Sequence, residues 1–292
     1  LVAATDLDTD RDGVKDALDE YPNDATRAFS RHYPGTDTWG TLAYEDQWPR
    51  RGDYDLNDVV VRYRTKEIMN AARQVVGLSI DYRVDARGGT MDTAFGVQLP
   101  GIPASTIASA NISVANGTTT SIQSESGQSS ATFIVAPLIR SLLPTSGNAN
   151  CPYVNTLADC PRTPGVNIHL DVNFTTPLAA TLFASPYNPF IYRVGQRGLE
   201  IHLPGKAPTS LADLSLLGTA DDRSVVNTSY TYMDAKRRPW ALDIPTAWAH
   251  PKERTDLMLP YPRFADWALS NGANARDWYV TDVQTQHTIS AQ

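Results

Sequence analysis

Apolar and polar residues alternate in short stretches through much of the chain. Residues 57–63 place Val59, Val61 and Tyr63 on one face, and residues 77–84 continue the same period of two. That period is typical of a β-strand with one buried face. Glycine, proline, asparagine or serine bounds each stretch, as is usual at strand ends. The same pattern recurs in four further stretches, which are residues 93–100, 130–137, 166–174 and 198–205.

Helical periodicity appears only near the C-terminus. Phe264, Trp267 and Ala268 share one helical face, and Asn271 and Gly272 follow as a C-cap. Elsewhere, 20 prolines and 18 glycines would interrupt long helices. We therefore expect a mainly β protein, an antiparallel, jelly-roll-like β-sandwich with one or two short helices.

Acidic residues gather at the start of the chain. Counted from Asp8, they fall at positions 1, 3, 5, 9 and 12 of a calcium-binding loop, with Gly13 at the sharp turn of position 6. Their mutual repulsion would keep the segment disordered, and a divalent cation would remove that repulsion. The predicted ligands of this first site are Asp8, Asp10, Asp12, the carbonyl oxygen of Val14, Asp16 and Asp19.

Two features separate this loop from a calcium sensor. Position 12 is Asp19 instead of the bidentate glutamate, with Glu20 beside it. The chain also leaves no room for an entering helix before Asp8, so we expect no helix–loop–helix unit. We predict a separate calcium-binding segment over residues 1–28 and a β-sandwich domain over residues 29–292. The pattern leaves open a subdivision of that domain near residue 150.

A second acidic constellation precedes the first long strand. The alternation of Asp53, Asp55 and Asn57 again points several oxygens at one cation from an extended backbone. Two other interpretations stay open. The carboxylates could form an ion-pair cluster with Arg50 and Arg51, or the Asp and Asn side chains could cap turns before the strand. The predicted second site comprises Glu45, Asp46, Asp53, Asp55, Asn57 and Asp58.

Cysteine and charge content indicate an extracellular setting. Cys151 and Cys160 bracket a short polar loop, which favours a disulfide formed in an oxidising compartment over two free thiols. The net charge of −7 argues against nucleic acid or an anionic membrane surface as the main partner. No apolar run is long enough to span a bilayer. The start at Leu1, without a leader, is what a mature exported chain would show.

Several blocks of the sequence resemble the LruC domain family, a domain of unknown function found in exported bacterial proteins. The most specific block is WGTLAYEDQWPRRGDYDLNDVVVRYR, followed by PYNPFIY, RGLEIHLPGKAPT, RRPWALDIP and YPRFADWALSNGANARDWY. These blocks run from about residue 38 to residue 279. The resemblance implies export and an outer-surface or secreted setting, and it supplies no established activity.

The N-terminal stretch resembles a type 3 thrombospondin calcium repeat, a usual companion of cell-surface domains. It departs from that repeat at Tyr21-Pro22, where a Cys-Pro pair is common, and only a single unit is present.

No catalytic motif stands out. The five histidines are scattered, and neither HExxH nor Gly-x-Ser-x-Gly occurs. His169 and His202 sit between apolar neighbours, so we expect both on exposed strand faces. We expect no enzyme activity, and a glycoside hydrolase is the least favoured class because carboxylate pairs alone do not establish one.

These features favour an exported bacterial surface or matrix protein that is a non-catalytic, calcium-dependent adhesion or binding module. Its expected cofactor is Ca²⁺, and its expected partner is a peptide or glycan on a surface. The alternative is a structural subunit of an extracellular filament or matrix. In that case strand edges or the apolar residues 1–4 would dock onto another copy. Both interpretations place the protein in the secreted fraction or on the outer cell surface.

Overall fold

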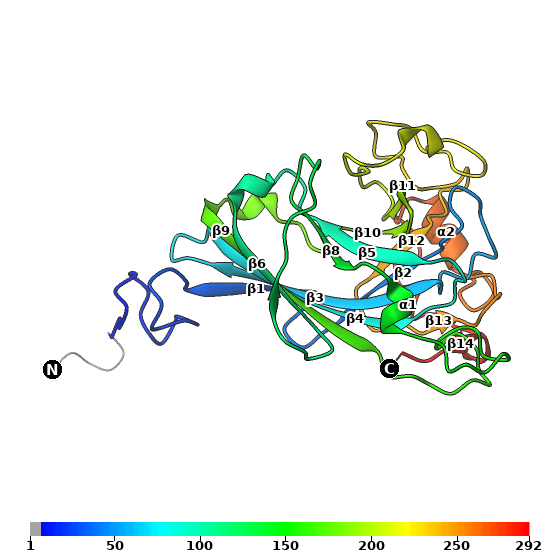
Figure 1. Ribbon diagram of the computed structural model, residues 1–292, viewed down its shortest axis with the longest axis horizontal. Coiled ribbons are helices and arrows are strands. Elements are labelled where there is room, and N and C mark those ends of the chain that lie inside the picture. Colours follow the sequence, from blue (N-terminus) through cyan, green and yellow to red (C-terminus); the bar gives the residue numbers. More distant parts are fainter. Residues whose placement is uncertain (1–6, 292) are drawn as a thin grey trace.

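The computed structural model describes residues 7–291 and contains two facing β-sheets (Figure 1). The larger sheet has the order β12-β2-β3-β4-β9-β6-β7, and β1 pairs with β3 beyond the end of β2. Its pairings are antiparallel. Its strands are β1 (Phe29–Tyr33), β2 (Gly40–Tyr44), β3 (Val59–Met69), β4 (Val75–Ala86), β6 (Ile107–Val114), β7 (Thr120–Ser121), β9 (Val166–Leu178) and β12 (Ala241–Ile244).

The smaller sheet has the order β11-β10-β5-β8, and its pairings are also antiparallel. Its strands are β5 (Thr93–Gln98), β8 (Thr132–Ala136), β10 (Asn188–Arg193) and β11 (Gln196–His202). A separate strand pair joins β13 (His250–Pro251) to β14 (Thr288–Ile289). The helices are α1 (Ile139–Leu142), α2 (Phe264–Leu269) and the 3₁₀ turns η2 (Ala104–Thr106), η3 (Ala180–Leu182), η4 (Leu214–Leu216) and η5 (Thr285–His287).

The main core lies between the two sheets. On the larger sheet, the alternating residues predicted to face inward are buried, among them Val61 and Tyr82. Phe95 of the smaller sheet packs edge-on against Tyr82, with 5.0 Å between ring centroids, and contacts Tyr44 at 6.4 Å. Edge-to-face packing of this kind adds to the free energy gained from burying the rings. The predicted antiparallel β-sandwich is therefore confirmed.

The C-terminal segment, residues 246–290, covers part of the outer face of the larger sheet. Ala43 and Leu242 point away from the main core, yet both are buried in a second apolar cluster. Aromatic rings of the C-terminal segment complete that cluster, including Trp248 and Trp278. Helix α2 belongs to this segment and confirms the helix predicted from periodicity. Its end is capped by Gly272, whose N–H donates to Trp267 O at 2.8 Å.

The two histidines predicted on exposed strand faces differ. His169 of β9 is partly exposed, as expected. The prediction for His202 is wrong, because its side chain is fully buried. It does point away from the main core, but Tyr232 from the connection after β11 covers it, with ring centroids 5.1 Å apart. Alternation identified the face of the strand correctly and gave no information about the loop that covers it.

The disulfide between Cys151 and Cys160 is present, as predicted. No helix within residues 7–291 is long and apolar enough to cross a bilayer, in agreement with the absence of an apolar run in the sequence. The N-terminal residues 1–4, proposed as a docking segment in the filament alternative, lie outside the described residues.

The two predicted acidic sites lie at opposite ends of β3. The N-terminal segment leads into β1, which pairs with the last five residues of β3. The second acidic stretch lies between β2 and the first residue of β3. Because a strand of eleven residues spans roughly 36 Å, the two sites are far apart. Figure 1 shows the N-terminal segment projecting from one end of the sandwich and α2 lying at the other.

Candidate metal centre

Antiparallel pairing of β2 and β3 assembles the second acidic stretch. Tyr44, the last residue of β2, pairs with Val59, the first residue of β3. The residues that follow Tyr44 and those that precede Val59 therefore meet at one edge of the sheet. With Glu253 of the C-terminal segment they form what we call the acidic cluster, which consists of Glu45, Asp46, Asp53, Asp55, Asn57, Asp58 and Glu253.

Glu45 is common to two groups of carboxylates. One oxygen each from Glu45, Asp53 and Asp55 lie within 4.8 Å of one another, and so do oxygens from Glu45, Asp46 and Asp58. This spacing suits carboxylates that share a cation, because calcium binds oxygens at 2.3–2.6 Å on all sides. Glu45 therefore links the two groups of carboxylates.

Several oxygens of the cluster are buried and lack a partner. Glu45 is fully buried, and neither of its carboxylate oxygens has a hydrogen-bond partner within the described part of the chain. Asn57 is also fully buried and donates from Nδ2 to Pro251 O at 3.1 Å, while its Oδ1 is unpartnered among residues 7–291. A buried polar atom without a partner costs free energy. A proton, a water molecule or a cation at these oxygens would remove that cost.

Backbone hydrogen bonds hold the other carboxylates in place. The N–H of Asp46 donates to Asp58 Oδ2 at 2.7 Å. Asp55 accepts from the N–H of Asn57 at 3.2 Å and from the N–H of Arg254 at 2.7 Å. The last of these bonds comes from the C-terminal segment. Backbone N–H groups from three places in the chain thus hold the carboxylates of the cluster.

Burial raises the pKa values of the carboxylates in the cluster. The pKa of Asp55 rises to about 8, and repulsion from Asp53 and Glu253 adds to the effect of burial. Burial likewise raises the pKa of Asp46 to about 6. The pKa values of Glu45 and Asp58 lie well above their ordinary values for the same reason, with further contributions from neighbouring carboxylates. The cluster therefore favours uptake of positive charge, as protons or as a cation.

Arginine does not neutralise the cluster in the way one interpretation of the sequence proposed. Arg51 forms an ion pair with Asp256 and lies over the ring of Tyr54. Among residues 7–291, no Lys, Arg or His nitrogen forms an ion pair with a carboxylate of the acidic cluster. Turn capping does occur, as in the bond from the Asn57 N–H to Asp55. It uses only part of the available oxygens.

Glycines make room for the carboxylates. A Cβ added at Gly52, where φ is +67°, would lie 2.2 Å from Glu45 Oε1. A Cβ at Gly89 would lie 2.2 Å from Asp46 Oδ2, and one at Gly88 would lie 1.9 Å from Asn57 Oδ1. Any side chain at these positions would collide with the atoms that face the cluster. The loop after β4 therefore forms one wall of the site.

Glu253 is the cluster member that the sequence did not reveal. Its Oε2 accepts from Thr156 Oγ1 at 2.9 Å and lies 3.0 Å from the position of a Cβ at Gly88. Burial, with repulsion from Asp53, raises its pKa to about 7. In the sequence it lies in HPKERTD among residues of both charges, without the alternation that marks the other members. Only the path of the C-terminal segment brings it to the site.

The N-terminal loop brings together three of its six predicted ligands. Carboxylate oxygens of Asp8, Asp10 and Asp12 lie within 4.8 Å of one another. Asp8 accepts from the N–H of Arg11 at 2.7 Å and from the N–H of Gly13 at 3.1 Å, which fixes the turn. The backbone at Gly13 has a φ of +95°, a conformation that favours glycine.

The other predicted ligands of this loop, Val14, Asp16 and Asp19, differ in their burial and in their hydrogen-bond partners. Asp19 is buried, and its pKa is raised by burial and by repulsion from Asp12 and Asp10. Its Oδ2 has no hydrogen-bond partner in the described chain, although Asp19 is not part of the group that Asp8, Asp10 and Asp12 form. Asp16 instead accepts two hydrogen bonds of 2.7 Å from Thr9. Val14 donates its N–H to Asp12 Oδ1 at 2.7 Å.

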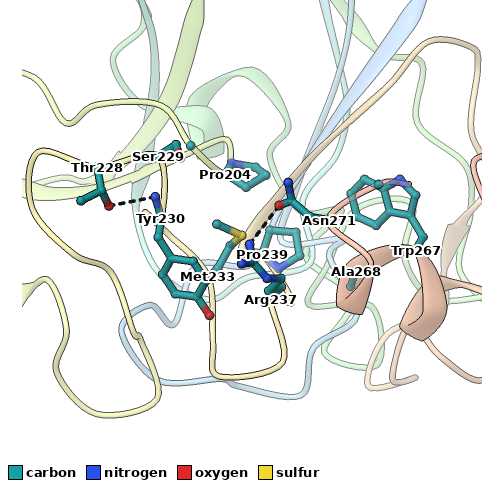
Figure 2. Close-up of a pocket in the computed structure, with 12 residues that line it drawn as sticks. Pro204, Thr228, Ser229, Tyr230, Met233, Arg237, Pro239, Trp267, Ala268 and Asn271 are labelled. Carbon is teal, nitrogen blue, oxygen red and sulfur yellow. Dashed lines mark hydrogen bonds between the residues drawn. The ribbon is translucent and has the colours of Figure 1, made fainter. Parts of the chain in front are cut away.

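A pocket of about 510 Å³ lies beside α2, outside the acidic cluster (Figure 2). One wall comes from the chain between β11 and β12, including Tyr230 and Arg237, and the other from α2 and its C-cap, including Trp267 and Asn271. None of its lining residues is acidic. No pattern in the sequence indicates this pocket, because its walls are irregular segments that lie far apart in the chain.

Comparison with known proteins supports the fold and gives a family. A search of curated proteins found no match. A crystal structure of a protein from Bacteroides ovatus, provisionally described as a lipoprotein, is similar with a TM-score of 0.68 at 22% identity. The similarity covers 90% of this chain and 76% of that chain. It shows a shared fold. The LruC and thrombospondin resemblances are not part of these matches and stay predictions.

The family match covers most of the sandwich. A family model described as a domain of unknown function, DUF4842, matches residues 73–279. That range includes the glycines of the loop after β4, Glu253 and α2, whereas the stretch from Glu45 to Asp58 precedes it. The chain belongs to the DUF4842 family.

Proposed function

We propose that this protein is an exported, non-catalytic surface protein that binds calcium and acts as a calcium-dependent binding module. The observation that carries the proposal is Glu45, whose two carboxylate oxygens are buried and unpartnered among residues 7–291. Glu45 also lies in both carboxylate groups of the acidic cluster. A buried carboxylate without a counter-charge is strongly unfavourable, and a bound cation removes that cost.

The chemistry of the donors favours calcium over other divalent cations. The cluster offers carboxylate and amide oxygens and no sulfur or imidazole ligand, which argues against zinc. Magnesium usually keeps several waters and takes few protein ligands, whereas calcium accepts six to eight oxygens in flexible geometry. Seven oxygen-bearing side chains that converge on one site match the behaviour of calcium. The N-terminal loop has the calcium-loop spacing independently.

Export is supported by two observations. The Cys151–Cys160 disulfide is typical of an oxidising compartment. The structurally similar Bacteroides ovatus protein is provisionally described as a lipoprotein. Outside the cell, weak calcium sites with dissociation constants of about 10⁻⁴–10⁻³ M are occupied. In that setting calcium acts as a permanent structural ligand instead of a signal.

Calorimetric titration of the chelator-stripped protein with CaCl₂ tests this proposal. We expect the wild-type protein to bind calcium, and we expect Glu45→Gln to bind calcium at least tenfold more weakly. Asp37→Asn is the matched control, because Asp37 is an exposed acid outside both sites. Calcium should also raise the Tm of the wild-type protein and of the control. Absence of calcium binding at millimolar concentration, or equal binding by Glu45→Gln and wild type, would show the proposal to be wrong.

A further inference from the structure

We propose that the pocket beside α2 binds an acidic oligosaccharide, and that cation binding at the acidic cluster organises this pocket through Tyr54. This inference rests on the proposed function and adds the ligand class and its link to calcium. The pocket is formed by the chain between β11 and β12 on one side and by α2 with its C-cap on the other (Figure 2).

The charge of the pocket selects an anionic ligand. Arg237 donates to Asn271 Oδ1 at 3.1 Å, and its guanidinium lies 5.0 Å from the ring centroid of Tyr230. It forms no ion pair with a carboxylate in the described part of the chain. The nearby Asp234 is paired with Arg238 instead, whose Nε donates to Asp234 Oδ2 at 2.6 Å. A guanidinium in a pocket without acidic side chains is a ready partner for a ligand carboxylate.

The shape and lining of the pocket favour a sugar. Tyr230 and Trp267 lie on either side of Arg237 in Figure 2, with Met233 and Pro239 between them. An aromatic ring offers a flat apolar surface for the C–H face of a sugar ring, and the neighbouring amide and guanidinium can bond its hydroxyl groups. About 510 Å³ is enough for one or two sugar units.

A peptide fits the pocket less well. Extended peptides usually add a strand to an exposed sheet edge, and helical peptides need a long apolar groove. None of the lining residues belongs to a strand, and α2 has only six residues. The pocket therefore offers no backbone ladder and no groove of the required length.

Tyr54 connects the acidic cluster to both walls of the pocket. It stands between the cluster members Asp53 and Asp55, and its side chain is buried. Its hydroxyl donates to Pro239 O at 2.9 Å, on one wall. Its ring packs against Phe264 of α2, with centroids 6.3 Å apart, behind the other wall.

The backbone of this connection is strained, so its conformation depends on its surroundings. Tyr54 has a φ of +60° and Leu56 a φ of +52°, values that non-glycine residues adopt rarely. Such conformations persist only where neighbouring contacts hold them. A cation shared by Asp53 and Asp55 would hold the loop on both sides of Tyr54. Without it, repulsion between these carboxylates favours another loop conformation and disturbs both walls of the pocket.

Binding measurements on the full chain test the inference. The acidic probes are sialyllactose and a hyaluronan tetrasaccharide, the neutral probes are lactose and chitotetraose, and the peptide probe is a tetrapeptide with a free carboxylate. Each is titrated in calcium and in chelator. We expect the acidic sugars to bind in calcium and at least tenfold more weakly in chelator. Arg237→Gln should remove the preference for acidic over neutral sugars. Trp267→Ala should weaken the binding of acidic and neutral sugars alike.

Tyr54→Phe tests the connection, since it removes only the hydroxyl that bonds Pro239. We expect this variant to bind calcium as wild type does and to bind the acidic sugar several-fold more weakly in calcium. Circular dichroism and direct calcium titration show whether each variant is folded and loaded, and Asp37→Asn is the unchanged control.

The possible outcomes separate the inference from the function it rests on. Calcium binding without any acidic-sugar binding at millimolar concentration would overturn the inference and leave the proposed function standing. Preferential binding of the peptide would also overturn the inference alone, and so would equal affinity for the acidic sugars in calcium and in chelator. Failure to bind calcium would overturn the proposed function itself.

Discussion

The carboxylate of Asp55 accepts a 2.7 Å hydrogen bond from the backbone N–H of Arg254, 199 positions further along the chain. This bond joins the loop before β3 to the C-terminal segment at the acidic cluster. Glu253, the neighbour of Arg254, adds its own carboxylate to the same cluster. The cluster is therefore complete only when the C-terminal segment lies against the sandwich. Cation binding and the packing of this segment should stabilise each other.

Replacement of Glu45 should change stability in opposite directions with and without calcium. In calcium, Glu45→Gln removes a ligand and with it the linkage stabilisation. This amounts to about 1.4 kcal/mol for one site at ten times its dissociation constant, or a Tm lower by about 2–6 °C. In chelator the same change replaces a buried carboxyl group, whose pKa burial raises well above its ordinary value, with a neutral amide, and it should leave the Tm unchanged or raise it. Thermal unfolding in both buffers checks this reversal. A similar loss in both would mean that Glu45 has only a packing role.

An alanine at Gly89 should block the site by its volume. Its Cβ would lie 2.2 Å from Asp46 Oδ2, so that carboxylate must move away from the cluster. We expect Gly89→Ala to weaken calcium binding at least tenfold in calorimetric titration. Gly101→Ala is a useful comparison, since Gly101 has a φ of +74° and open space around its Cβ position. It should cost about 1 kcal/mol of stability and leave calcium affinity unchanged. Loss of affinity in both variants would contradict the steric explanation.

The sequence predicted the parts of the site that are close together in the chain. The alternation of Asp53, Asp55 and Asn57 is visible because an extended backbone presents every second residue on one side. Glu45 and Asp46 lie close to them because antiparallel pairing of β2 and β3 returns the chain to the same edge of the sheet. Glu253 could not be predicted, since an acid in a stretch of mixed charge is the usual sign of a solvent-exposed loop.

The fold, like the site, could be predicted where it depends on neighbouring residues and not where it depends on segments distant in the chain. Periods of two residues predicted β4 and β9 well, because burial of one strand face is recorded in each strand's own sequence. They gave no account of Ala43 and Leu242, which face outward from the sandwich and are covered by the C-terminal segment. His202 is buried for a related reason. What covers the outer face of a sheet is decided by segments distant in the chain.

The N-terminal loop should bind its cation independently of the acidic cluster. The two sites lie at opposite ends of β3, and effects at sites this far apart usually add. The double change Asp10→Asn and Asp12→Asn should remove one calcium from the total measured by native mass spectrometry and leave the main unfolding transition in place. Glu45→Gln should remove calcium from the remaining sites. If the double variant also abolished binding at the acidic cluster, the two sites would have to be coupled.

Loss of the disulfide should destabilise the loop after α1. Cys151 and Cys160 close a loop with a sequence separation of 9. By loop-closure entropy, such a crosslink contributes about 2–3 kcal/mol. The double variant Cys151→Ser and Cys160→Ser should therefore unfold at lower denaturant concentration than the wild-type protein. Reduced wild type should behave like the variant. Equal stability of the oxidised, reduced and variant proteins would show that the loop is held by other contacts.

His169 should contribute stability that is lost in alkaline solution. Its ring nitrogens face two carboxylates, with Nδ1 2.6 Å from Asp81 and Nε2 3.0 Å from Asp171. Hydrogen bonds to Asp171 and Asp81 raise the pKa of His169 to about 10. Because the folded pKa exceeds the unfolded value of about 6.5, the contribution is complete below pH 6.5 and declines as pH rises towards 10. His169→Gln should thus be less stable than wild type at pH 6, and the difference should shrink by pH 10. Denaturant unfolding of both proteins at several pH values measures this, and a difference that did not change with pH would rule out the charged pairing.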